Sequence, residues 1–310
     1  MPSNTMVKNK SSVDALYYVN RETGLKETEI VYGEKELFFL YRYPIGRYLR
    51  RLLVRRRWFS QINAIPKKIR WSKRKIRPFI ERYGVDAQEA EKPLNQYRCL
   101  DEFFTRRLRS GARPVDHNVN YLVSPADGRV TAYTISNDLK MRIKGQNVSI
   151  QRLTGNLMDS NALKDGSAMV IRLAPKDYHR FHFPVDSVVS ATTPINGALE
   201  SVHPIALDAG SRSFENKRTF LELPSRTFGS IYMIEVGALT VGTIVQTYQP
   251  GAIQKAQEKG YFRFGGSTIV LLWGKKGPVV DPDITANTEA GMETLVKCGT
   301  RIASINGATR

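Results

Sequence analysis

The chain has 310 residues, of which 41% are hydrophobic and 25% are charged, and it carries a formal net charge of +18. No apolar run approaches the roughly 18–20 residues that cross a bilayer, and the N-terminus lacks the apolar stretch of a secretory signal. The two cysteines, Cys99 and Cys298, form no Cys-x-x-Cys pair, which argues against a zinc or thiol-redox site and fits a reducing compartment. The composition is that of a soluble globular protein.

The first part of the chain is polar and then strongly basic. We expect residues 1–33 to form a flexible tail and residues 34–110 a basic helical region. Fourteen Lys or Arg and no Asp or Glu lie between Tyr41 and Arg77. Ile45 and Leu49, followed by Leu52 and Leu53, recur at helical spacing, so an amphipathic helix at an anionic membrane surface is predicted. A helix packed on the core, or a nucleic-acid-binding surface using residues 41–77, is the alternative.

Further helices and then strands are predicted along the chain. Short helices are expected from Pro78 to Tyr83, ending at Gly84, and from Leu100 to Leu108. From residue 111 to 310 short β-rich runs alternate with Gly, Pro, Asn and Asp turns. The predicted fold is therefore α+β, with helices at the N-terminal end followed by a mainly antiparallel β core. The expected strands are 141–150, 168–173, 187–194, 219–223, 230–236, 240–247 and 267–273.

One of these strands begins with a serine that follows two glycines. Gly265 and Gly266 precede Ser267 and Thr268, and the apolar run that follows, 269–273, is predicted to be a buried strand. Glycine lets the backbone adopt conformations that bring other groups close. The hydroxyl of Ser267 could then attack the carbonyl of Gly266, which is the first step of self-cleavage, although an ordinary loop is the alternative.

A histidine pair and a turn aspartate are the other candidate functional groups. His179 and His182 follow Asp177 within a segment bracketed by prolines, so a turn or short irregular segment could bring their side chains together. No third and fourth ligands stand at suitable spacing for a metal, and no metal site is predicted. Asp127 lies in a Pro-Ala-Asp-Gly sequence that is typical of a β-turn, and the turn could fix its carboxylate.

The chain resembles the phosphatidylserine decarboxylase family from about Leu100 to its C-terminus. The resemblance rests on several motifs in the order that the family has them, and Gly265 stands where the family often has leucine before Gly-Ser-Thr. The motifs are Asp-Glu-Phe-Phe-Thr-Arg at 101–106, Arg-Pro-Val-Asp at 113–116, Ser-Pro-Ala-Asp-Gly-Arg-Val at 124–130, Ala-Pro-Lys-Asp-Tyr-His-Arg-Phe-His-Phe-Pro at 174–184, Phe-Glu-Asn-Lys-Arg at 214–218 and Val-Gly-Ala-Leu-Thr-Val-Gly at 236–242.

This resemblance implies a self-cleaving proenzyme. Asp127, His182 and Ser267 would form a triad in which Asp127 orients His182 and His182 takes the Ser267 proton. Cleavage between Gly266 and Ser267 would give a large and a small subunit and a pyruvoyl group at residue 267. As the cofactor, the pyruvoyl group would form a Schiff base with phosphatidylserine and release CO₂, giving phosphatidylethanolamine. His179, positioned by Asp177, would reprotonate the product.

The resemblance also bears on partners and location. It implies a homodimer that acts as a peripheral protein on an anionic membrane and binds no nucleic acid. The cytoplasmic face of a bacterial membrane fits best, and an organellar membrane remains open. A Ser-His-Asp hydrolase is the second alternative, although the chain lacks the Gly-x-Ser-x-Gly elbow. Acyl-chain preference and the role of His203 are not fixed by the sequence.

Overall fold

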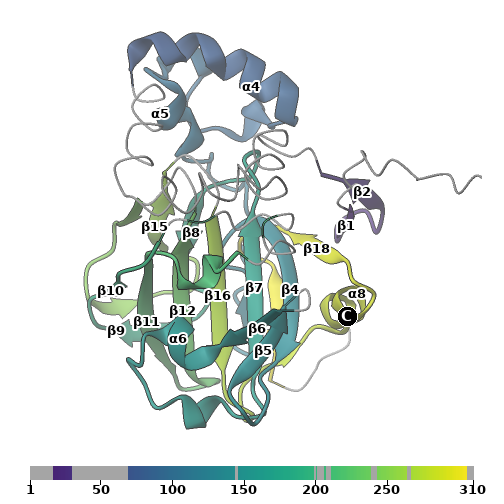
Figure 1. Cartoon of the computed structure of the whole chain (residues 1–310). Coiled ribbons are helices and arrows are strands. Elements are labelled where there is room, and N and C mark those ends of the chain that lie inside the picture. Colours follow the sequence, from purple (N-terminus) through teal and green to yellow (C-terminus); the bar gives the residue numbers. More distant parts are fainter. Residues whose placement is uncertain are drawn as a thin grey trace, which may run out of the picture.

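One large sheet, covered at one end by short helices, dominates the structure (Figure 1). The computed structural model describes residues 17–29, 69–143, 146–198, 200, 206, 211–238, 243–263 and 267–305. The predicted amphipathic helix over 34–60, the two glycines before Ser267 and His203 lie outside these residues. The α+β class with mostly sheet is confirmed, but the N-terminal amphipathic helices are not.

The large sheet has nine strands in the order β10-β11-β12-β16-β7-β4-β18-β1-β2. Each neighbouring pair in this described sheet is antiparallel, except that β1 runs parallel to β18. The predicted mainly antiparallel core is therefore confirmed. The strands are β10 Thr193–Ile195, β11 Arg218–Ser225, β12 Gly229–Gly237, β16 Ser267–Trp273, β7 Ser167–Leu173, β4 Gly128–Thr134, β18 Glu293–Val296, β1 Tyr17–Asn20 and β2 Lys26–Thr28.

Shorter elements surround this sheet. The remaining strands are β13 Ile244–Gln246, β15 Glu258–Phe262 and β8 Arg180–His182 in one sheet; β14 Gly251–Ile253 and β9 Ser187–Val189 in a second; β17 Val279–Val280, β19 Arg301–Ser304 and β3 Tyr121–Val123 in a third; and β5 Lys140–Ile143 and β6 Gln146–Ser149 in a fourth. The α-helices are α4 Ile76–Tyr83, α5 Leu100–Phe104, α6 Ile150–Thr154 and α8 Pro282–Glu289. The 3₁₀ turns are η2 Arg70–Lys75, η3 Ala87–Glu89, η4 Leu94–Gln96, η5 Ser160–Leu163 and η6 Ser213–Glu215.

Both faces of the sheet are buried at its centre, where β16 lies between β12 and β7. Ile269, Leu271 and Trp273 of β16 pack into one apolar cluster, whereas Val270 and Leu272 pack into another on the opposite face. A strand covered on both sides needs apolar residues at every position rather than at alternate ones. This explains why residues 269–273 form a continuous apolar run, and it fixes the register of β16.

The expected flexible tail over 1–33 is wrong for residues 17–29, which form β1, β2 and the turn between them. β1 pairs with β18 near the other end of the chain, and Tyr18 is only 1% exposed. Glu29 is also buried, and it accepts hydrogen bonds from Arg172 at 2.8 and 2.5 Å. A buried carboxylate needs such a cation, because leaving it unpaired costs several kcal/mol. The ion pair with Arg172 therefore anchors this segment to the sheet.

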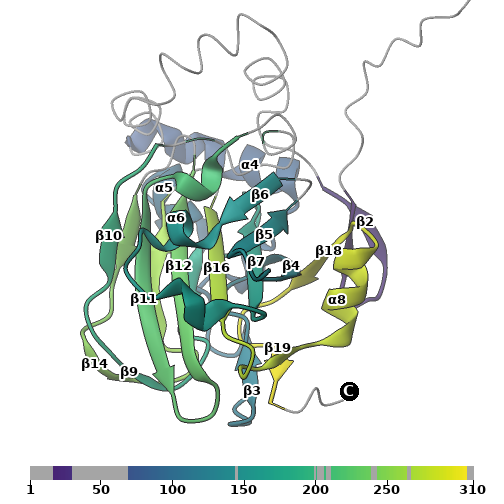
Figure 2. The ribbon, with the colours of Figure 1, turned by 60° about the horizontal axis from the view of Figure 1, so that its bottom comes forward.

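The helices differ from prediction in extent and place. α4 ends as expected at Gly84, which adopts a left-handed conformation with φ 64°. α5 covers only Leu100–Phe104 instead of reaching Leu108, and the chain leaves the helix at Thr105. Helices are not confined to the N-terminal end, because α8 follows β17 and packs against β4 and β18 (Figure 2). In the part of the chain that is described, no helix is long and apolar enough to span a bilayer.

Candidate active site

The candidate residues gather at one end of the large sheet. β4 begins directly after Asp127, and its antiparallel neighbour β7 ends at Leu173, so both open onto the same end. Ser267 begins β16 there, and its backbone pairs with Leu173 on one side and Gly237 at the end of β12 on the other. The segment that carries both histidines follows β7. Antiparallel pairing therefore explains how motifs far apart in the sequence meet.

His179 is fully buried and contacts the helical segment that covers this end of the sheet. Its ring is 3.9 Å from that of Phe104 in α5, measured between centroids. Its Nδ1 is 3.0 Å from the carbonyl oxygen of Asp177, which can only accept, so Nδ1 carries the proton in the neutral ring. Nε2 is then a free acceptor, and it has no partner among the described residues. Burial lowers the pKa of His179 to about 4, so the ring is neutral at pH 7.

His182 ends β8 and faces a cysteine. Its amide donates to the carbonyl of Pro125, 2.8 Å away, and its Nδ1 lies 3.3 Å from the Sγ of Cys298. Burial lowers the pKa of His182, although the charges of Glu258 and Asp127 oppose that shift. Burial raises the pKa of the Cys298 thiol, which keeps it protonated at neutral pH. A neutral imidazole beside a neutral thiol is the ground state of this pair.

Asp127 does not hold His182 directly. Its carboxylate accepts from Arg113 at 2.6–3.0 Å and from the amide of Cys298 at 2.9 Å. Burial would lower the pKa of Arg113, but its hydrogen bonds to Asp127 and Glu89 outweigh this and raise it. Within the described residues no hydrogen bond joins Asp127 to His182. Cys298 connects them instead, since its amide binds Asp127 while its sulfur contacts the imidazole.

Asp177 contacts His179 through its backbone and not through its carboxylate. The carboxylate pairs with Arg129, which is fully buried, and also accepts from the amide of Ala174 at 2.6 Å. Arg129 in turn lies 3.3 Å from Glu29. The ion pair with Arg129 therefore holds the turn whose backbone carbonyl contacts the imidazole, while the positioning of His179 by Asp177 stays a prediction.

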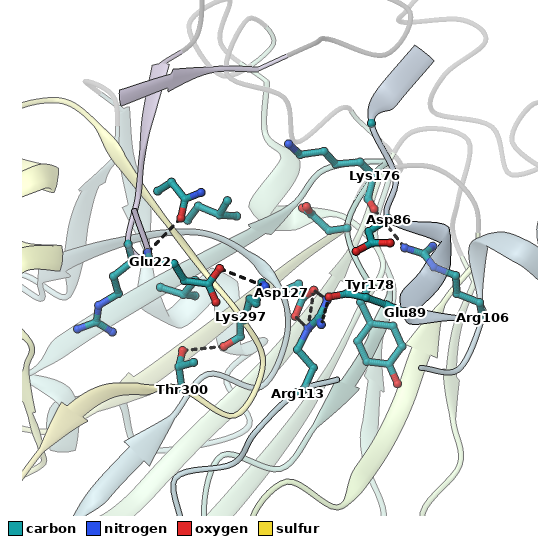
Figure 3. A pocket seen from close by; sticks show the side chains of 16 residues that line it. Glu22, Asp86, Glu89, Arg106, Arg113, Asp127, Lys176, Tyr178, Lys297 and Thr300 are labelled. Atoms are coloured by element: carbon teal, nitrogen blue, oxygen red, sulfur yellow. Dashed lines mark hydrogen bonds and ion pairs between the residues drawn. The ribbon is translucent and has the colours of Figure 1, made fainter. Parts of the chain in front are cut away.

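A cavity of about 420 Å³ opens between the helical segment, the β1–β2 turn and this end of the sheet (Figure 3). Asp127 and Asp177 both line it, together with eight other charged side chains and the residues around them. In Figure 3 Arg113 reaches toward Asp127 and Glu89, while Arg106 enters from the helical segment. The cavity provides a polar, half-enclosed site beside the buried histidines.

Several residues in this site were not predicted from the sequence. Arg106 and Arg113 belong to the motifs at 101–106 and 113–116, but their sequence context gave them no role. No role was predicted for Cys298, and its contact with His182 depends on a pairing across 116 positions. Of these residues, only the arginines could have been predicted from the sequence, because a buried aspartate such as Asp127 requires a cation nearby.

The described residues contain no group of three or more His, Cys, Asp or Glu that could hold a metal ion. The chain matches the family model for phosphatidylserine decarboxylase over residues 100–304. It is 38% identical over 298 residues to the phosphatidylserine decarboxylase proenzyme of Fusobacterium nucleatum, covering 94% of this chain and 98% of that protein. It is 39% identical to the proenzymes of Clostridium botulinum, covering 93% and 98%, and Chlamydia pneumoniae, covering 91% and 95%.

These matches make the protein an enzyme of the carboxy-lyase class. It belongs to the phosphatidylserine decarboxylase family, whose relatives matched here are named as proenzymes.

The buried, neutral His179 should make the protein acid-labile. Its pKa is about 4 in the folded protein against 6.5 when unfolded, so the unfolded chain binds the proton first as pH falls. The free energy of unfolding should be unaffected by this residue above pH 6.5 and should fall by up to about 3 kcal/mol between pH 6.5 and 4. Urea unfolding of wild type and His179→Gln at pH 7 and pH 4.5 measures this loss.

The exposed His117 offers the matched control. His117→Gln should keep the full wild-type loss between the two pH values, whereas His179→Gln should show a smaller one. Equal losses in wild type and His179→Gln would contradict a depressed pKa at His179.

Proposed function

We propose that the protein removes the carboxyl group of phosphatidylserine as CO₂ and yields phosphatidylethanolamine. The observation that carries this proposal is the position of Ser267, which opens a buried strand at the sheet end where Asp127 and both histidines gather. The family match supports the same activity and gives no support to a nucleic-acid-binding protein or a hydrolase. With carboxyl-labelled phosphatidylserine, purified enzyme should release labelled CO₂ and form an equal amount of phosphatidylethanolamine. Release of free serine instead would indicate a hydrolase.

We propose that the active form arises when the chain cleaves itself between Gly266 and Ser267. The hydroxyl of Ser267 would attack the preceding carbonyl, which breaks the amide bond and leaves an ester and a free amine. Loss of the Cα proton of residue 267 would then expel the Gly266 carboxylate and leave a dehydroalanine, which water would hydrolyse to an N-terminal pyruvoyl group and ammonia. That group supplies a carbonyl that bonds the substrate amine and withdraws the electron pair left by CO₂. The surroundings fit such a group, because Leu173 and Gly237 fix the backbone of residue 267 in the sheet. In addition, the adjoining loop holds an imidazole nitrogen, Nε2 of His179, that has no partner among the described residues.

His182 is the base for self-cleavage in this proposal. With the Nδ1 proton donated to the Sγ of Cys298, Nε2 keeps its lone pair and can accept the Ser267 proton. Asp127 acts through Cys298, since it binds the amide of that residue and thereby fixes where the sulfur lies. In this proposal the predicted triad is therefore indirect. Asp127 positions Cys298, and the thiol of Cys298 lies between the carboxylate and the imidazole of His182.

His179 carries the proton of the decarboxylation step. Its neutral form has a free Nε2, so it first acts as an acceptor and takes a proton from the ammonium group of the incoming substrate. The same proton is returned to the substrate carbon after CO₂ leaves, and the residue ends as it began. Burial destabilises the protonated imidazole, so it gives the proton up readily to the substrate carbon.

Replacing Cys298 tests the role of its thiol in self-cleavage. Cys298→Ala should slow cleavage roughly fivefold, because a net hydrogen bond of about 1 kcal/mol to His182 is lost. Cys298→Ser keeps an acceptor and should cleave near the wild-type rate. Pulse-labelled chain followed on denaturing gels gives the rates, with Cys99→Ala as the matched control. Cleavage of Cys298→Ala as fast as that of Cys99→Ala would show that the thiol does not position His182.

The enzyme acts at an anionic membrane surface and as a homodimer in this proposal. The described end of the basic segment supports the first point, since Ile69 and Trp71 are about half exposed among Arg70, Lys73 and Lys75. Exposed aromatic and aliphatic side chains among cations suit the headgroup region of a bilayer. Such a surface would bring phosphatidylserine to the enzyme, and the cytoplasmic face of a bacterial membrane is the proposed location.

A further inference from the structure

Arg106 is a buried cation that makes no close ion pair with a carboxylate of the described residues, although the charges of Asp127, Asp177 and Glu89 act on it from a distance. It follows α5, is 4% exposed and lines the cavity (Figure 3). Its Nη2 donates to the carbonyl of Lys176 at 3.2 Å, and its guanidinium lies 5.1 Å from the centre of the Phe103 ring. Nε and Nη1 are buried and have no hydrogen-bond partner in the part of the chain that is described. Two donors of a planar fork are therefore left for a ligand.

The other cations of the cavity are mostly satisfied by carboxylates of the protein. Five Lys or Arg line it, and three of them make ion pairs within the described residues. Those pairs are Arg21 with Asp281 and Asp283, Arg113 with Asp127 and Glu89, and Lys297 with Glu22. Arg106 makes no such pair, and the ammonium of Lys176 contacts the hydroxyl of Tyr18, at 3.2 Å, and the ring of the same residue. Two cations without a carboxylate partner among the described residues thus line the cavity.

A guanidinium in this position calls for an anion. Burying an ion without a partner costs several kcal/mol, and the aromatic face of Phe103 offsets only part of that cost. The charge of Arg106 also persists, because arginine does not lose its proton in proteins. An oxyanion bound at one of the free nitrogens would supply that anion through a charge-assisted hydrogen bond.

We propose that Arg106 and Lys176 form an anion subsite that holds the phosphodiester of the phosphatidylserine headgroup. This inference rests on the proposed function and gives its substrate a fixed position. The subsite adjoins the chemistry, since Phe104, two residues before Arg106, packs on the ring of His179. Lys176 likewise lies in the turn that leads to that histidine. A headgroup held here by its phosphate would present its amine and carboxylate to the buried end of the sheet.

The phosphate suits this subsite better than the substrate carboxylate. Decarboxylation removes the carboxylate charge as neutral CO₂, so a strong ion pair with that group would stabilise the ground state more than the transition state and slow the reaction. The phosphodiester keeps its charge throughout, and binding it lowers the energy of substrate and transition state alike. Arg106 is therefore a binding residue that positions the headgroup.

Binding to an uncleaved chain tests the subsite without any need for turnover. In the full-length Ser267→Ala background, short-chain phosphatidylserine and phosphatidylethanolamine are titrated by calorimetry. Adding Arg106→Gln should weaken the binding of both lipids by a similar factor, roughly 10- to 100-fold, because both carry the phosphodiester. Arg106→Lys keeps the positive charge but lacks the planar guanidinium. It should weaken the binding of both lipids by a smaller factor that is again similar for the two. Arg109→Gln removes an exposed arginine nearby and should leave both affinities unchanged.

The contradicting results are equally distinct. Weakened binding of phosphatidylserine alone would mean that Arg106 takes the carboxylate. Binding of both lipids that Arg106→Gln leaves unchanged, or no binding of either lipid to the Ser267→Ala parent itself, would mean that no phosphate subsite exists there. Should Arg106→Gln fail to fold by thermal melting, Arg106→Lys carries the same comparison. If wild type releases no CO₂ from phosphatidylserine while Arg106 still governs binding of both lipids, the proposed function fails and the subsite stands. If wild type releases CO₂ but lipid binding does not depend on Arg106, the subsite fails and the proposed function stands.

Discussion

Ser267→Ala should remain a single uncleaved chain with no decarboxylase activity. The substitution removes the one oxygen that can attack the carbonyl of Gly266, and it leaves β16 in place because alanine fits a strand paired on both sides. The loss should be complete rather than partial, since without cleavage no pyruvoyl group forms and the substrate amine has no carbonyl to bond. Denaturing gels and labelled CO₂ release measure the two effects separately.

A neighbouring substitution controls for damage to the strand. Thr268 also lies at the start of β16 and is buried, and Thr268→Val changes a hydroxyl for a methyl group at nearly constant volume. It should cleave, because its hydroxyl has no part in the acyl shift. Normal two-chain protein from Ser267→Ala would refute the assignment of the nucleophile.

The two histidines should fail at different steps. His182→Ala should accumulate precursor, because the base that takes the Ser267 proton is gone while the strand pairing remains. His179→Gln should cleave normally but turn over roughly 100- to 10,000-fold more slowly, the range expected when a positioned proton donor is lost. Gel analysis gives the cleaved fraction, and CO₂ release per cleaved chain gives the turnover of each variant.

The reverse pattern would exchange the two roles. Precursor that accumulates in His179→Gln, with efficient cleavage in His182→Ala, would assign the unpartnered Nε2 of His179 to self-cleavage. Glutamine is used at His179 because the side chain is fully buried against Phe104, and alanine there would add a cavity to the loss of the imidazole.

The parts of the fold that local patterns determine could be predicted. β16 reads as a buried strand because both of its faces are apolar, and α4 stops at Gly84 because only glycine adopts that left-handed conformation at little cost. α8 was missed although Asp281 and Pro282 are typical of a helix start. Its packing face is short, with Ile284 as its one buried residue.

The parts that depend on distant pairing could not be predicted. The polar sequence of residues 17–29 resembles a tail, and only the pairing of β1 with β18 and the buried contact of Glu29 with Arg172 hold it in the sheet. At the site, residue types and motifs identified Asp127 and both histidines, but not which groups face them. The approach of Cys298 to His182 follows from the position of the loop after β18, which no local pattern encodes.

Intact-mass spectrometry of the purified protein tests the central claim most directly. The account predicts two chains in place of one, with a large subunit that ends at Gly266 and a small one that comprises residues 267–310. The small subunit should carry a pyruvoyl group, so its mass should be lower than that of the unmodified peptide by one ammonia (NH₃), because the amine and hydroxyl of serine are replaced by a ketone and a methyl group. A single mass for the intact 310-residue chain in fully active enzyme would contradict the account.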